Sequence, residues 1–131
     1  MAKTLDDSCI DGALNILKNG ATQLCICNAQ PLTYSEATTT ADGGANKYCL
    51  GKKTGLTASN FTGPADGAVS GRKITVNAAT GITVDYSGTA LFVALCSGSV
   101  LLAVTSCTSQ VVTAGNTCNT PLFTWTITDP T

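Results

Sequence analysis

Two neighbouring apolar segments, residues 90–95 and 100–104, constrain the fold more than any other feature of the chain. They flank Ser97-Gly98, a turn signal, so residues 89–96 and 99–107 are predicted to form a β-hairpin. Successive side chains of a strand point to opposite faces, and these segments do not alternate with polar residues, so both faces are apolar. Both faces therefore need cover. We expect an N-terminal helix to cover one of them, with a neighbouring subunit as the alternative.

The rest of the second half of the chain has the rhythm of strands joined by tight turns. Turn signals recur about every 8–12 residues, which is typical of antiparallel sandwiches and barrels. In residues 72–77 apolar and polar side chains alternate, which places Ile74 and Val76 on one face of a strand. In residues 123–128 every second residue is Thr, so one face of that strand is apolar and the other is lined by Thr. The fold class predicted is mainly β: an antiparallel β-sandwich, or a small barrel, with one N-terminal α-helix packed on it. Further strands are expected at residues 22–27, 56–61, 81–86 and 110–113.

The first 53 residues have a different character. Apolar residues recur at spacings of three and four over residues 5–18, which predicts an amphipathic helix capped by Thr4 and ended by Asn19-Gly20. Residues 28–53 are polar and rich in turn signals, so we expect a long loop, of the kind that often becomes ordered against a partner. With 131 residues, the chain is predicted to be a single domain, 1–131, whose sandwich strands occupy residues 54–131.

The charge pattern argues against several classes of partner. Only 11% of residues are charged and the net charge is −1, whereas soluble domains usually have roughly 25% charged residues. Lys47, Lys52 and Lys53 are interpreted as turn residues, so no nucleic-acid binding is expected. The chain has no apolar run of about 18 residues and no apolar leader at its start, so we expect no membrane partner. A surface poor in charge favours stable contacts with protein, because interface cores are depleted of charge.

No catalytic, cofactor-binding or metal site is predicted. The chain has no histidine, which removes the usual triads and most zinc sites. A strand would point the sulfurs of Cys25 and Cys27 the same way without wrapping a metal ion. Gly51-Lys52-Lys53-Thr54 lacks the spacing of a phosphate-binding loop. Asp66 and Asp85 have no spacing that favours a pair of catalytic carboxylates.

Seven cysteines in so short a chain suggest a disulfide scaffold, but each lies in or beside an apolar segment. The count is odd and a secretory signal is missing, so buried reduced thiols are the preferred interpretation. One or two bridges formed after release from a cell remain the alternative.

Aromatic and basic residues supply the candidate contacts. Trp125 lies on the same predicted strand face as Phe123 and Ile127, and it is interpreted as a residue that packs in the core. Tyr34 and Tyr48 lie in or near loops, where exposed aromatic residues can anchor an interface. The candidate partner contacts are Tyr34, Tyr48, Lys52 and Lys53.

Five segments in the same order resemble a family of small structural proteins encoded among the head genes of tailed bacteriophages. The segments are LDDSCIDGALNIL at residues 5–17, GATQLCIC at 20–27, QPLTYSEAT at 30–38, SGRKITV at 70–76 and WTITDP at 125–130. The resemblance implies a β-sandwich with an N-terminal helix, no catalytic residues, and a role as a capsid decoration (cement) protein.

The expected partners are therefore the major capsid protein or other virion proteins, and a homo-oligomer stays open. The expected location is the virion, with the capsid surface preferred, and the host cytoplasm during assembly. A component of the tail or head–tail junction is the alternative, as is a carbohydrate- or receptor-binding module.

Overall fold

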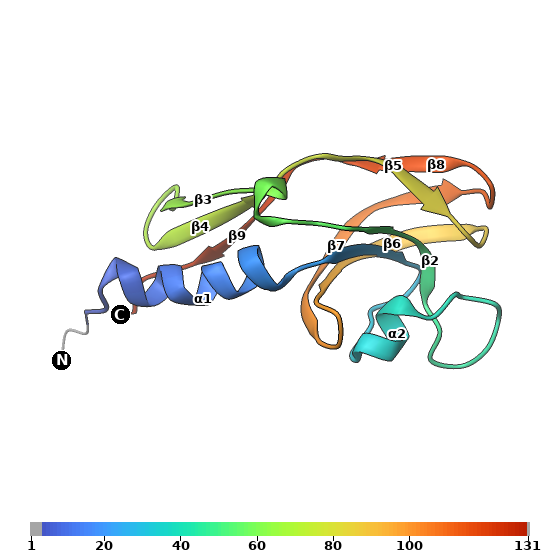
Figure 1. Ribbon diagram of the computed structural model, residues 1–131, viewed down its shortest axis with the longest axis horizontal. Coiled ribbons are helices and arrows are strands. Elements are labelled where there is room, and N and C mark those ends of the chain that lie inside the picture. Colours follow the sequence, from blue (N-terminus) through green and yellow to red (C-terminus); the bar gives the residue numbers. More distant parts are fainter. Residues whose placement is uncertain (1–3, 131) are drawn as a thin grey trace.

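The computed structural model describes residues 4–130, which form two antiparallel sheets and two α-helices (Figure 1). The mainly β fold with an N-terminal helix packed on it is confirmed, and the larger sheet curls into a half-barrel. None of the described helices is long and apolar enough to cross a membrane. In chain order the elements are α1 (Asp7–Gly20), β1 (Gln23–Cys27), α2 (Tyr34–Thr38), β2 (Cys49–Thr54), η1 (Ala58–Asn60), β3 (Phe61–Asp66), β4 (Arg72–Val76), β5 (Ala79–Val84), β6 (Gly88–Cys96), β7 (Leu101–Val112), β8 (Thr117–Thr120) and β9 (Phe123–Ile127).

The six-stranded sheet has the order β7-β6-β1-β2-β5-β8, and the three-stranded sheet has the order β3-β4-β9. The small sheet and α1 lie at one end of the molecule, whereas the half-barrel and α2 lie at the other (Figure 1). β1 is central in the larger sheet, and all five of its residues are buried. This strand therefore separates two apolar clusters, one on each face of the sheet.

Helix α1 forms where its apolar spacing predicts, with small changes at both ends. Asp6 rather than Thr4 is the cap: its side chain accepts a hydrogen bond from the Ser8 backbone N–H at 2.9 Å. The buried stripe consists of Ile10, Leu14 and Leu17. The apolar spacing predicts that Cys9 belongs to this stripe, but Cys9 is exposed. The small sheet covers only part of the apolar face of the helix.

Arg72 of β4 fastens α1 to the small sheet. Its Nε and Nη2 donate to the two carboxylate oxygens of Asp11 at 2.8 and 3.0 Å, and its Nη1 donates to Asp66 at 2.6 Å. The two-point bond to Asp11, followed by the contact with Asp66, raises the pKa of the guanidinium. One side chain thus joins the helix, β4 and β3.

The cover of the β6–β7 hairpin corrects one prediction. The hairpin forms as expected, but α1 packs on β3, β4 and η1 instead of on the hairpin. Two residues separate α1 from β1, so the helix runs past the end of the sheet and does not fold back over it (Figure 1). The short helix α2 covers one face of the hairpin instead, through Ala37, which is fully buried.

The predicted loop over residues 28–53 is a second correction. It contains α2, capped by Thr33, whose side chain accepts from the Glu36 N–H at 3.2 Å, and most of β2. A five-residue helix is too short to give a recognisable apolar period. The Gly-Lys-Lys stretch, for which the sequence predicts a turn, lies inside β2. There Gly51 is needed because an added Cβ would collide with the carbonyl oxygen of Thr83 on β5.

Candidate functional site

The main surface feature is an opening between the two terminal strands of the larger sheet. β7 and β8 are consecutive in the chain, and residues 113–116 connect them. Two such strands usually pair as a hairpin, yet β7 pairs with β6 and β8 pairs with β5. They are the two terminal strands of the half-barrel, so each keeps an unpaired edge within the described chain. We call the space between these edges the seam.

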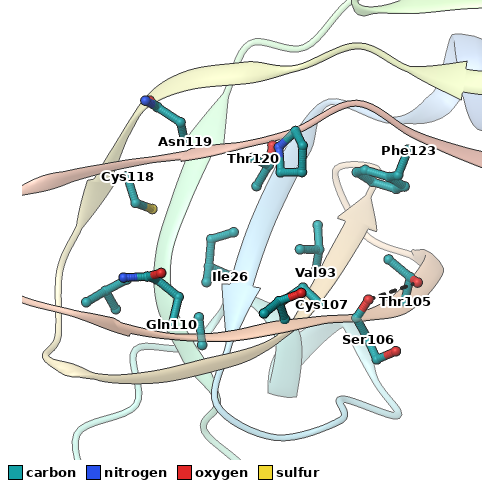
Figure 2. A pocket seen from close by; sticks show the side chains of 14 residues that line it. Ile26, Val93, Thr105, Ser106, Cys107, Gln110, Cys118, Asn119, Thr120 and Phe123 are labelled. Carbon is teal, nitrogen blue, oxygen red and sulfur yellow. Dashed lines mark hydrogen bonds between the residues drawn. The ribbon is translucent and has the colours of Figure 1, made fainter.

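Both edges of the seam line one cavity of about 440 Å³ (Figure 2). Its floor consists of Ile26, Ala90 and Val93, which belong to the inner strands β1 and β6. A second hollow of about 390 Å³ adjoins it and shares lining residues with it, so the opening continues along the edges. The remaining residues of the first cavity are Thr105, Ser106, Cys107, Thr108, Gln110, Val112, Cys118, Asn119, Thr120, Pro121 and Phe123.

The lining of the seam is neutral throughout. Of its 14 residues, none is Asp, Glu, Lys or Arg, and the polar members carry hydroxyl, amide or thiol groups. Ionic ligands therefore have no counter-charge in the cavity. The lining suits an uncharged ligand that combines apolar surface with hydrogen-bonding groups.

Thr120 is the most informative polar group in the seam. Its residue is 7% exposed, and its Oγ1 is buried without a hydrogen-bond partner. A buried hydroxyl without a partner costs about 1–3 kcal/mol. A bound molecule that offers a donor or an acceptor at this point would remove that cost.

Two thiols face the cavity from opposite edges. Cys107 belongs to β7 and Cys118 to β8, and both are partly buried (Figure 2). Burial raises the pKa of each thiol, so both groups stay largely protonated near neutral pH. Protonated thiols are weak nucleophiles, so no catalytic role is assigned to these two groups. Their rate of alkylation can instead show whether the cavity is occupied.

A second group of thiols lies on the opposite face of the sheet, beneath α2. It consists of Cys25, Cys27, Cys49 and Cys96, each at most 2% exposed. Hydrogen bonds with Cys49 and Cys96, together with burial, raise the pKa of Cys25, and burial is the first cause of the raised pKa of Cys27. No three metal-ligating side chains of residues 4–130 are grouped so as to hold a metal ion.

Of the four residues predicted from sequence as partner contacts, three lie close together and one lies on the other face of the sheet. Tyr34, Tyr48 and Lys52 lie around α2: the Tyr34 hydroxyl accepts from Gln23 Nε2 at 3.0 Å, and Lys52 Nζ donates to the Thr38 carbonyl at 3.5 Å. Lys53 pairs with Leu24 and so lies on the other face of β2, where its Nζ donates to the Thr80 carbonyl at 3.0 Å. Both tyrosines are half-buried.

The seam itself was missed by sequence reasoning. Residues 110–113, expected as a strand of their own, are instead the end of the long strand β7, and residues 56–61, also expected as a strand, contain the short helix η1. The strand expected at residues 123–128 is found as β9. β8 was not expected, because its Thr-Cys-Asn-Thr sequence has no apolar alternation. Trp125 packs against the main core and its Nε1 is buried, in agreement with its interpretation as a packing residue.

Comparisons with models of protein families, with curated proteins and with solved structures give no match.

The burial of the cysteines predicts their order of reaction. With iodoacetamide at neutral pH, Cys9 is expected to be alkylated first and Cys107 and Cys118 more slowly, because partial burial disfavours their thiolates. The four thiols beneath α2 are expected to react only after unfolding. Peptide mass spectrometry over a time course measures the order. Labelling of Cys25 in the folded protein at the rate of Cys9 would contradict this burial.

Proposed function

We propose that this chain is a capsid decoration protein of a tailed bacteriophage, which binds assembled head subunits and holds neighbouring capsomers together. The family resemblance of five ordered segments supports the phage head as the location. The observation that carries the binding role is the seam: an uncharged cavity of about 440 Å³ bordered by two unpaired strand edges. Unpaired edges are sites where other chains add to a sheet.

The surface composition supports the same role. Only 11% of residues are charged, and large apolar side chains such as Leu32, Val111 and Leu122 are more than half exposed. Interfaces that assemble spontaneously have cores depleted of charge. A modest contact repeated over a lattice gives strong overall attachment through multivalency.

Particles that lack the protein are expected to release their DNA at a lower temperature and after a milder osmotic shock than complete particles. The reason is that the contacts between capsomers are fewer. Fluorescence of a DNA-binding dye during heating measures release, and adding purified protein back is the control that should restore resistance. Unchanged resistance in depleted particles would argue against a decoration role.

Copy number separates the head from the tail. Quantitative mass spectrometry of purified virions is expected to give a copy number of the same order as that of the main capsid subunit. A small ring-like number would instead indicate the tail or the head–tail junction.

A further inference from the structure

We propose that the seam binds an extended segment of a partner protein, which adds as a strand between β7 and β8 and closes the half-barrel. This inference deepens the proposed function and rests on it for the identity of the partner, a segment of the capsid protein. The mode of binding is argued from the seam alone.

Both edges of the seam present backbone groups without a strand partner. β7 is twelve residues long and β8 is four, and each has one edge free of strand partners. Natural proteins usually protect free edges with Lys, Pro, inward-pointing charges, bulges or very short strands. Here Pro121 follows the short strand β8, and β7 has a bulge where its register with β6 shifts between Ala90 and Phe92. No charged side chain lines the seam, however: its polar residues are Thr, Ser, Gln and Asn. Two edges that border the same space can hydrogen bond to both sides of one inserted strand.

The topology defines how the strand would run. Every neighbouring pair in the order β7-β6-β1-β2-β5-β8 is antiparallel, so strand direction alternates and the two terminal strands run in opposite directions. A segment between them must be antiparallel to one and parallel to the other. The length of β8 limits the doubly paired part to about four residues, a span of roughly 13 Å.

The cavity defines the chemistry of the segment. Every second side chain of the inserted strand points into the cavity over Ile26, Ala90 and Val93, so these side chains are small or medium-sized and apolar. The absence of charge from the lining excludes Asp, Glu, Lys and Arg at the same positions, because a buried unpaired charge is costly. The Thr120 hydroxyl supplies a hydrogen bond to a polar group of the segment.

A small apolar molecule fits the volume but not the polar groups. Ligand pockets of about 300–1,000 Å³ are common, yet a hydrocarbon would leave Thr120 and both strand edges without partners. A peptide strand can hydrogen bond to the Thr120 hydroxyl and to both strand edges. The peptide is therefore the occupant that the seam favours.

Substitutions on the edge of β7 test the inference. Thr108 and Gln110 are exposed and line the seam, so Thr108→Lys and Gln110→Lys each place a charge where the segment would bind. We expect each variant to bind depleted particles at least about tenfold more weakly in a co-sedimentation assay. Thr126→Lys is the matched control, because Thr126 is an exposed threonine on β9, an edge strand of the small sheet, and does not itself line the seam. It is expected to bind as the unmodified protein does, and circular dichroism checks that all three variants fold.

The native thiols give an independent readout without substitution. Cys107 and Cys118 are expected to be alkylated at least about tenfold more slowly in the particle-bound protein than in the free protein, because an inserted strand covers both. If the unmodified protein binds particles but both lysine variants bind equally well and the thiols keep their free rates, the seam inference is wrong and the proposed function stands. If the unmodified protein does not bind particles, the proposed function fails. A small molecule that native mass spectrometry detects on the purified protein, and that slows the alkylation of both seam thiols, would also overturn the inference.

Discussion

Replacing Leu50 by alanine is expected to lower the free energy of unfolding by about 3 kcal/mol, within the range for leucines in closed cores. Leu50 is 0% exposed and belongs to the main core cluster. It lies at a bulge of β2, where the register with β1 shifts between Ile26 and Cys27. Its side chain also lies directly against Gly88 of β6. The cavity left by the substitution would therefore be enclosed by strands that cannot easily move together. Urea unfolding followed by circular dichroism measures the change.

The matched control is Leu32→Ala. Leu32 is 77% exposed, so the same chemical change should alter the free energy of unfolding by less than about 0.5 kcal/mol. Equal effects at the two positions would mean that Leu50 is not enclosed as the fold requires.

Replacing Gly71 by alanine is the second large effect, expected to lower the free energy of unfolding by about 3 kcal/mol. Gly71 has φ +72°, in the left-handed region that side chains other than glycine rarely adopt. An added Cβ would also overlap the carbonyl oxygen of Ile127 on β9. Because Gly71 immediately precedes β4, relief of the overlap would disturb the β4–β9 pairing, which begins with Arg72 and Ile127.

Gly98→Ala is the control for this prediction. Gly98 lies in the β6–β7 turn, and nothing lies within 4 Å of a Cβ added there. Thermal unfolding of the two variants side by side should show a large loss of stability for Gly71→Ala and almost none for Gly98→Ala. Similar melting temperatures would show that the small sheet does not approach Gly71 closely.

Much of the fold was predictable from local patterns. The stripe of Ile10, Leu14 and Leu17 predicted α1, and the apolar segments around Ser97-Gly98 predicted the hairpin. These elements are long and strongly patterned, so the spacing of side chains alone identifies them. Because both faces of β6 are apolar, the sequence also predicted that each face is covered.

The identity of the cover was not predictable in the same way. It depends on the two residues between α1 and β1, which direct the helix away from the hairpin, and on α2, which is stabilised by a cap and by Ala37 more than by an apolar period. The seam was beyond sequence reasoning for a similar reason. Whether β7 and β8 pair with each other or with β6 and β5 is decided by long-range contacts, and nothing in the connecting residues specifies it.

The proposed binding of this protein through the open seam of its half-barrel can be seen in a cryo-electron microscopy reconstruction of the virion that contains the chain. We expect copies of the half-barrel on the outer surface of the head, each with an extended capsid-protein segment hydrogen bonded between β7 and β8. Copies bound to the head with the seam empty and facing solvent would contradict it.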